Sequence, residues 1–141
     1  MSLCIFCEIP IKNRERILFE DELIILIKDI NPIALIHLQC IPKFHIKNIN
    51  TLTYKNIPLI EHMRDVSINY ILSNYDKINK KDIIQGFHIP PFYSVKHLHL
   101  HCIVPPYNNC FIKLFKVNCI MRNVNVVLNK LKKEKPELLL G

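Results

Sequence analysis

The chain has 141 residues, of which 50% are hydrophobic and 22% charged, and this combination predicts one domain with a single core over residues 1–141. Lys, Asn, Asp or His interrupts the apolar residues every few positions, which excludes a run of roughly 20 apolar residues that could cross a membrane. The formal charge of +7 favours an anionic partner, but we interpret most of it as a solvated basic surface and do not favour nucleic acid as that partner.

Apolar runs rich in Ile predict two antiparallel strands, at residues 23–28 and 37–42. Residues 29–32 between them contain Asn-Pro, which is a turn signal. Apolar residues at spacings of three and four then predict the main helix between about residues 53 and 75.

Residues 83–88 and 97–104 predict two more strands, joined by a rigid loop at residues 89–93 that contains two prolines. A last helix has an apolar face made by Val124, Val127, Leu128 and Leu131. Strands outnumber helices without strict alternation. We therefore predict an α+β fold: an antiparallel sheet of about five strands, one main helix and a C-terminal helix.

The first eight residues, Met-Ser-Leu-Cys-Ile-Phe-Cys-Glu, lack the basic start and the apolar stretch of a secretory signal. We therefore expect an intracellular protein, cytoplasmic or nuclear. In that setting the six cysteines are expected to be reduced or to bind a metal rather than to form structural disulfides.

The most informative pattern is a run of three histidines, His97, His99 and His101, which alternate with apolar residues. A strand has a side-chain period of two, so it would place the three imidazoles on one face, where they line a common cleft. The intervening side chains would then face the core: Leu98, Leu100 and Cys102.

Three aligned imidazoles suit either metal binding or nucleophilic attack on phosphorus, because an imidazole nitrogen can form a phosphoramidate. Ser94 and nearby basic residues favour an anionic substrate. A catalytic metal site built from His would normally have carboxylates behind the ligands, and no Asp or Glu lies between Gln85 and Cys110. The context favours phosphate chemistry, with a metal site as the alternative.

Residues 97–103 resemble the signature of the histidine triad (HIT) family of nucleotide hydrolases and transferases. Three further segments resemble family motifs in the same order: the opening at residues 4–9, the nucleoside loop at 28–32 and the Pro-Lys-x-His-Ile turn at 41–46. Within the family, residues 86–94 resemble most the Hint-like nucleotide-binding proteins of the third type, with aprataxin next. The Gly-Gly-Gln-Ser of other Hint proteins is missing except for Ser94.

The resemblance implies a single HIT domain that hydrolyses adenosine 5′-phosphoramidates or related adenylates to AMP through a nucleotidyl-histidine. By position in the motif, His99 is the nucleophile and His101 contacts the phosphate oxygens. Ser94 would donate to the phosphate or the leaving group, and His97 would orient His99. No catalytic cofactor is implied.

The nucleoside site follows from the same resemblance. Asp29 would accept hydrogen bonds from the ribose hydroxyls of a purine nucleotide. Apolar residues would wall the base: Ile5, Phe6, Ile9, Ile27 and Ile30. The resemblance also implies a homodimer in which two sheets join edge to edge and the main helix contributes to the interface.

Cys4-x-x-Cys7 is a weak metal signal by itself, because two cysteines in an apolar segment are often core residues. Zinc-containing relatives pair such cysteines with the His of the Pro-Lys-x-His turn and the first His of the triad, here His45 and His97. Two thiolates and two imidazoles form a closed set that is typical of structural Zn²⁺. Without metal, the cysteines would be core thiols and the two histidines would support His99.

Other histidines and cysteines remain. His88 has a counterpart in aprataxin that assists phosphate chemistry, but its spacing from His99 differs, which leaves open whether it reaches the site. His37 and His62 lack a motif and are interpreted as strand and helix surface residues. Cys102 and Cys110 are interpreted as packing residues.

Two alternatives to the phosphoramidate hydrolase remain open. One is an aprataxin-like enzyme that removes AMP from the 5′ ends of nucleic acids. The other is a nucleotide-binding interaction module.

Overall fold

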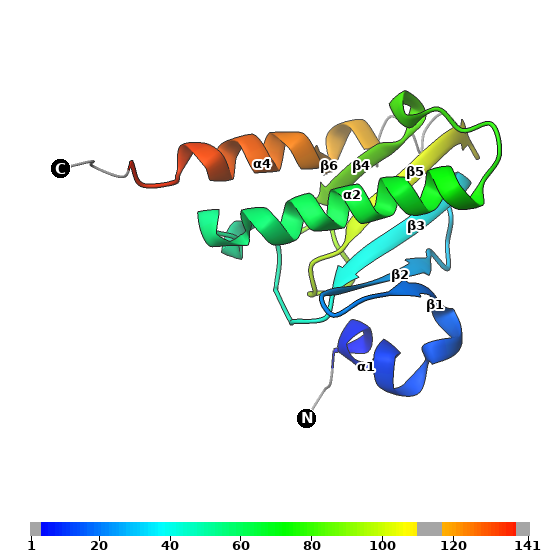
Figure 1. The fold of residues 1–141 in the computed structure, drawn as a ribbon, viewed down its shortest axis with the longest axis horizontal. Helices are drawn as coiled ribbons and strands as arrows, with labels where there is room; N and C mark the ends of the chain where they lie inside the picture. Colours follow the sequence, from blue (N-terminus) through cyan, green and yellow to red (C-terminus); the bar gives the residue numbers. More distant parts are fainter. Residues whose placement is uncertain (1–3, 110–116, 138–141) are drawn as a thin grey trace.

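The computed structural model describes residues 4–109 and 117–137. One sheet forms the middle of the molecule, with α2 and α4 along one face and α1 near the other end of the sheet, beside β1 and β2 (Figure 1). Among the helices in these two ranges, none has the length and apolar character needed to span a bilayer.

Within the described residues the sheet has six strands in the order β1-β2-β3-β5-β4-β6, and every neighbouring pair is antiparallel. The strands are β1 (Ile17–Glu20), β2 (Ile24–Lys28), β3 (Ala34–Pro42), β4 (Ile84–His88), β5 (Leu100–Tyr107) and β6 (Met121–Asn123). The helices are α1 (Ile5–Lys12), α2 (Ile57–Asn74) and α4 (Val124–Lys133). Short 3₁₀ turns occupy Arg14–Arg16, Ile49–Thr51, Tyr54–Asn56 and Lys80–Asp82.

The helical layer is held by apolar stripes. Helix α2 begins with a proline in its first turn, where a missing N–H costs nothing, and buries Ile60, Met63 and Ile71. Helix α4 starts at an Asn123 cap and buries the four residues predicted from its spacing. Burial of each such aliphatic side chain contributes roughly 1.5–3 kcal/mol to the stability of the folded state. The stripes pack on the sheet side chains that alternate toward them, among them Leu26, Leu38, Leu100 and Cys102, and Leu98 joins the same cluster from just before β5.

The opposite face of the sheet is covered only in part. Phe6 and Ile9 of α1 pack on Ile25, Ile27 and Ile41 and form a second, smaller cluster. Ala34 of β3 and Ile103 of β5 belong to a third small cluster farther along this face. On β3, His37 and Gln39 lie between Ala34 and Ile41, and this polar stretch between the two clusters is left for the functional site.

The α+β class, the antiparallel sheet and the two predicted helices are confirmed, and the strand count is six rather than about five. Strands β1 and β6 and helix α1 were not placed by the sequence patterns. The strand predicted at 97–104 begins instead at Leu100, because the Leu98 N–H donates to the carbonyl of Ile46 (2.6 Å) and holds residues 97–99 outside the sheet. Cys110 lies outside the described residues.

Strand β6 lies very close to β4. A Cβ built on Gly86 would stand 2.4 Å from Met121 Cγ and 2.9 Å from the Arg122 carbonyl oxygen. Glycine is therefore required at position 86 for this close backbone approach. With β6 docked there, β1 and β6 are the outermost strands in the part of the chain that the structure describes.

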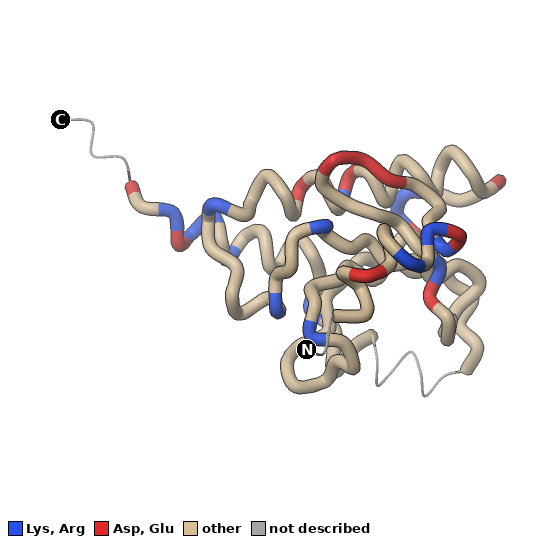
Figure 2. Tube along the Cα trace, turned by 90° about the horizontal axis from the view of Figure 1, so that it is seen from below, with Lys and Arg blue, Asp and Glu red and all other residues tan. Residues whose placement is uncertain are grey.

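The Lys and Arg residues of the described ranges are spread along the chain. Figure 2 shows Lys and Arg in several separate segments, with Asp and Glu among them. This distribution favours the interpretation of the +7 charge as a solvated surface.

Candidate active site

The register of three strands brings polar side chains together on the face that α1 leaves open. Gln39 of β3 lies opposite His101 of β5, and His37 lies opposite Ile103. Asp29 follows β2, and its N–H donates to the His37 carbonyl (3.0 Å). Because strand side chains alternate, His37, Gln39, His101 and Asp29 share one face.

His99 is held by the backbone next to it. Its Nδ1 lies 2.6 Å from the His97 carbonyl oxygen, and since a carbonyl only accepts, Nδ1 carries the ring proton. The lone pair of the neutral ring is therefore on Nε2. Burial lowers the pKa of His99 below its usual value, while the hydrogen bond to His97 and the charge of Asp29 act in the opposite direction. The ring is thus neutral near pH 7 and has a nucleophilic nitrogen.

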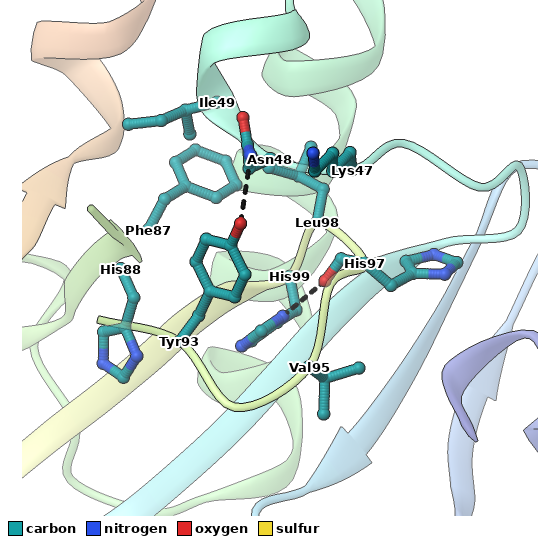
Figure 3. A pocket seen from close by; sticks show the side chains of 10 residues that line it. All are labelled: Lys47, Asn48, Ile49, Phe87, His88, Tyr93, Val95, His97, Leu98 and His99. Carbon is teal, nitrogen blue, oxygen red and sulfur yellow. Dashed lines mark hydrogen bonds between the residues drawn. The ribbon is translucent and has the colours of Figure 1, made fainter. Parts of the chain in front are cut away.

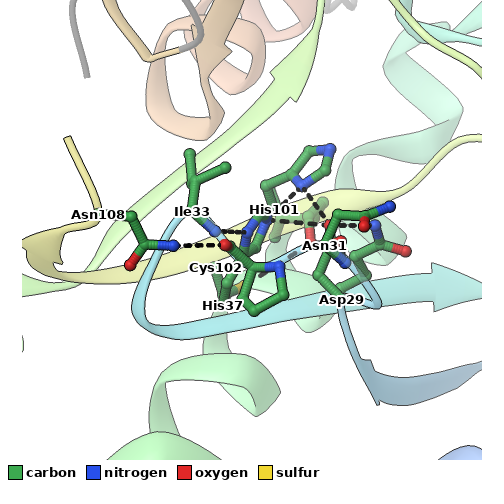
Figure 4. Close-up of polar contacts among 10 residues, drawn as sticks. Asp29, Asn31, Ile33, His37, His101, Cys102 and Asn108 are labelled. Atoms are coloured by element: carbon green, nitrogen blue, oxygen red, sulfur yellow. Dashed lines mark hydrogen bonds and ion pairs between the residues drawn. The ribbon is translucent and has the colours of Figure 1, made fainter. Parts of the chain in front are cut away.

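Asp29, His37 and His101 form a buried polar network (Figure 4). The Asp29 carboxylate accepts from the Asn31 N–H (2.8 Å) and from Gln39 Nε2 (2.6 Å). His37 Nε2 lies 3.2 Å from the same carboxylate and 2.8 Å from His101 Nδ1. The network links the residue predicted to bind ribose with the residue predicted to bind phosphate.

The hydrogen bonds of His37 determine the tautomer of His101. The Ile33 N–H donates to His37 Nδ1 (3.2 Å), so the single proton of His37 is on Nε2. That proton points at His101 Nδ1, which must accept. The proton of His101 is therefore on Nε2, and His101 is a hydrogen-bond donor on its far edge.

His99 and His101 line a cavity of about 240 Å³ together with most of the predicted site residues. The predicted residues in its wall are Ile5, Phe6, Asp29, Ile30, Ser94, His99 and His101. Ile9 and Ile27 are fully buried and do not line the cavity, because the face of α1 that carries Ile9 packs directly on β2, which carries Ile27.

His97 points away from this cavity, contrary to the expectation that the three histidines line one cleft. It is 1% exposed, and its Nε2 donates to the Pro42 carbonyl (2.8 Å). The chain has not yet entered β5 at this residue, so strand alternation does not govern its direction. Its Nδ1 faces Cys4, Cys7 and His45 instead.

These four residues form a compact donor set. His97 Nδ1 is 3.3 Å from Cys4 Sγ, 3.4 Å from Cys7 Sγ and 3.2 Å from His45 Nδ1, and Cys7 Sγ is 3.4 Å from His45 Nδ1. All four atoms lie within 4.8 Å of one another. Burial and the neighbouring Cys4 raise the pKa of Cys7 to about 11, so without a cation this thiol is protonated. The sequence prediction of a common site for Cys4, Cys7, His45 and His97 agrees with this placement.

His88 and the loop that follows it also reach the site. The His88 ring stacks on His101 with centroids 4.2 Å apart and lies 6.3 Å from the His99 ring. Figure 3 shows the Tyr93 hydroxyl meeting Asn48, whose side-chain amide donates to it (3.2 Å). This contact fixes the loop that places Ser94 and Val95 in the cavity wall.

Sequence reasoning gave no role in the site to four polar residues of the cavity wall, Arg16, Asn31, His37 and Gln39, or to the apolar Ile33 and Val95. The interpretation of His37 as a surface residue is wrong, since it is 7% exposed and its ring bonds to His101. Alternation of His37 and Gln39 with Leu38 and Cys40 could have placed both on the polar face. His62 does lie at the surface of α2, where it contacts Asp21 (2.6 Å).

Comparison with known proteins identifies the family. A model described as scavenger mRNA decapping enzyme C-term binding matches residues 3–114. A solved structure of a HIT family hydrolase from Clostridium thermocellum Cth-393 has a TM-score of 0.65 and 29% identity, and covers 78% of this chain and 96% of that one. Adenosine 5′-monophosphoramidase HINT3 of Danio rerio is 40% identical over 121 residues, which are 82% of this chain and 74% of that protein. The chain belongs to the histidine triad (HIT) family.

Other HIT relatives differ in the chemistry that their names describe. Bifunctional adenosine 5′-phosphosulfate phosphorylase/adenylylsulfatase HINT4 of Arabidopsis thaliana is 42% identical, over 74% of this chain and 71% of that protein. The aprataxin ortholog Hnt3 from Schizosaccharomyces pombe has a TM-score of 0.55 and 19% identity, over 74% of this chain and 57% of that one, and this likeness shows the fold alone.

Proposed function

We propose that this HIT protein is a hydrolase that cleaves adenosine 5′-phosphoramidates or related adenylates and releases AMP through a nucleotidyl intermediate on His99. The observation that carries the proposal is the state of His99. Its Nδ1 proton is engaged by a carbonyl, burial lowers its pKa, and the ring lines a cavity of about 240 Å³. The names of the HINT3 and HINT4 relatives support an adenosine 5′-phosphate as the transferred group.

In the proposed reaction each group has one task. His99 Nε2 attacks the α-phosphorus, a phosphorus–nitrogen bond forms and the bond to the leaving group breaks. His101, as a donor, stabilises the charge on the phosphate oxygens, and Ser94 at the cavity wall donates to the phosphate or the leaving group. Water then attacks the same phosphorus, the bond to His99 breaks and AMP leaves.

The nucleoside would occupy the rest of the cavity. Asp29 is oriented by Asn31, Gln39 and His37, so its carboxylate is fixed before a ribose arrives. Ile5, Phe6 and Ile30 supply apolar surface for the base.

The test is turnover of adenosine 5′-phosphoramidate by wild-type protein and by His99→Ala. The variant should lose activity by several orders of magnitude but keep its affinity for AMP, because the side chain contributes the nucleophile and little of the binding. His62→Ala, which removes a histidine outside the cavity, should keep full activity. Activity of His99→Ala within about tenfold of wild type would exclude His99 as the nucleophile. No turnover in wild type, with AMP bound, would favour the interaction module.

A second candidate function is removal of AMP from the 5′ ends of nucleic acids. It is favoured by His88, which stacks on His101 beside the predicted phosphate position. One solved Hnt3 structure is in complex with DNA. Ranking kcat/KM for adenosine 5′-phosphoramidate against 5′-adenylated DNA decides between the two functions.

We also propose that Cys4, Cys7, His45 and His97 hold one structural Zn²⁺. The donor set fits: tetrahedral Zn–N bonds of 2.0–2.1 Å place two nitrogens roughly 3.3 Å apart, and the His45 and His97 nitrogens are 3.2 Å apart. The Pro42 carbonyl holds the His97 proton on Nε2, so Nδ1 has the lone pair that a ligand needs. Bound zinc would cross-link α1 to the segment before β5, without an open position for substrate.

We further propose a homodimer, as the resemblance to Hint-like proteins implies. Edge-to-edge pairing would use β1 or β6, because these strands have unpaired edges in the described part of the chain.

A further inference from the structure

Arg16 is a cation in the cavity wall that neither the motif nor the proposed chemistry uses. It ends the 3₁₀ turn Arg14–Arg16, and it is half-buried while its neighbours Arg14 and Glu15 are exposed. Arg14 pairs with Glu20 (2.7 Å). The Arg16 guanidinium makes no side-chain hydrogen bond or ion pair with any residue in the ranges 4–109 and 117–137.

The topology places Arg16 at the opposite end of the cavity from His99 and His101, where the phosphate of a substrate is predicted to bind. Arg16 directly precedes β1, whereas His99 directly precedes β5 and His101 lies at its start. The order β1-β2-β3-β5 separates them by three strand spacings, roughly 14 Å. Asp29, the ribose acceptor, follows β2 and lies between them. A nucleotide with its phosphate at His99 and its ribose at Asp29 therefore directs its base toward Arg16.

Two apolar side chains flank this end. Ile5 and Ile30 are 61% and 75% exposed, yet both line the cavity. Such side chains suit the flat faces of a base and leave its polar edge to be recognised by another group. Arg16 is a half-buried polar group at this end, and it offers only donors in a planar fork.

We propose that Arg16 reads the edge of the purine and favours guanine over adenine, so that guanosine 5′-phosphate conjugates are substrates of this site. Guanine presents two adjacent acceptors, O6 and N7, which a guanidinium contacts with two parallel hydrogen bonds. Adenine places an N6 amino donor where guanine has O6, and this donor opposes the N–H groups of Arg16. The inference rests on the proposed function for the chemistry and widens its substrate class.

Asn31 is the other polar side chain at this end, and an amide could favour adenine through N6 and N7. Asn31 is exposed, so its side-chain amide stays hydrated. It therefore discriminates less strongly between guanine and adenine than a half-buried guanidinium does. A phosphate on the ribose is disfavoured as the partner of Arg16, because it would lie beside the Asp29 carboxylate.

The experiment compares guanosine and adenosine 5′-phosphoramidates as substrates of wild type, Arg16→Leu, Arg16→Lys and the control Arg14→Leu. Arg16→Leu should lower the ratio of kcat/KM for guanosine to that for adenosine by about tenfold, within the 5- to 150-fold range of one bidentate base contact. Arg16→Lys should recover only part of the ratio, because an ammonium lacks the fork. Arg14→Leu removes the same charge from the same turn and should leave the ratio unchanged.

Calorimetric binding of GMP and AMP to the same proteins separates this inference from the chemistry. If wild type hydrolyses neither substrate, the proposed function fails, and the Kd ratio still decides the role of Arg16. The inference is overturned if the guanosine-to-adenosine ratio, in kcat/KM or in Kd, changes by less than twofold between wild type and Arg16→Leu. Equal losses for both bases also overturn it, because they would show a general contribution of charge or stacking. A ratio that changes in Asn31→Ala but not in Arg16→Leu would assign base recognition to Asn31.

Discussion

His37 provides the most direct test of the buried network, because its role depends on three contacts. In His37→Phe, an aromatic ring of similar width replaces the imidazole, and the hydrogen bonds to the Ile33 N–H and to His101 Nδ1 are lost. Removing one partner of a buried hydrogen bond costs about 1–3 kcal/mol, so the loss of two should lower the free energy of unfolding by roughly 2–6 kcal/mol. That is a large part of the stability of a domain, which is about 5–15 kcal/mol.

The catalytic effect is separate from the effect on stability. Without His37, the Nε2–H that makes His101 Nδ1 an acceptor is gone, and the His101 ring can adopt the other tautomer and present a lone pair where phosphate oxygens need a donor. Removing one such donor outright costs roughly 10²- to 10³-fold in kcat. Because His101 keeps the correct tautomer part of the time, kcat should fall by about 10- to 100-fold. The Kd for AMP should change less, since Ile5, Phe6 and Asp29 remain.

Three measurements check this reasoning: thermal unfolding, steady-state release of AMP from adenosine 5′-phosphoramidate, and AMP binding. His37→Gln keeps an acceptor and a donor, and it should restore part of kcat. His62→Phe is the matched control, because it removes a histidine that contacts a carboxylate, Asp21, outside the cavity. A folded His37→Phe protein with kcat within threefold of wild type would refute the tautomer argument.

Three further predictions concern other parts of the site and the assembly. Asp29→Asn should raise KM about tenfold or more for a ribonucleotide substrate and clearly less for its deoxyribose analogue, because hydrogen bonds to charged groups contribute roughly 1.5–3 kcal/mol; equal effects on both substrates would contradict a contact with ribose hydroxyls. Cys4→Ser, or chelation, should lower the melting temperature first and activity only secondarily. Elemental analysis of protein purified without chelators should find about one zinc per chain. If added zinc does not change the melting temperature, Cys4 and Cys7 are core thiols. Light scattering at micromolar concentration should give twice the 16.7 kDa of one chain, and a mass near 16.7 kDa would count against the dimer.

The sequence predicted those parts of the fold that repeat with a clear period. The spacing of Val124, Val127, Leu128 and Leu131 placed the last helix and its buried face, and all four residues are buried. Strand β6 has only three residues, Met121–Asn123, which is too short for a pattern. Its position depends on the lack of a Cβ at Gly86, and a single glycine does not indicate which strand will pack on it.

The site was predicted where a motif specified it and missed where only pairing assembles it. Ser94, His99 and His101 are close in sequence and line one cavity. His37 and His101 are 64 residues apart, and they meet because the register pairs Gln39 with His101. Alternation within a strand can be read from sequence, but the choice of neighbour and register depends on the whole sheet. Arg16 was missed for the same reason, because it follows no motif and reaches the cavity only through the docking of β1.

The buried histidines show how the backbone gives one residue type different chemistry. The Pro42 carbonyl accepts a hydrogen bond from His97 Nε2–H, so the lone pair of His97 is on Nδ1 and faces the cysteines. The His97 carbonyl accepts a hydrogen bond from His99 Nδ1–H, so the lone pair of His99 is on Nε2 and is available to attack phosphorus. At His37 the backbone contact is a donor, the Ile33 N–H, so the ring proton is on Nε2 and forms the hydrogen bond to His101 Nδ1. A change in the backbone at residues 33, 42 or 97 would therefore alter the chemistry of a ring without touching the ring itself. This dependence explains why the nucleophile is placed just before β5 rather than within it, since a carbonyl in the ladder would already be paired with a neighbouring strand.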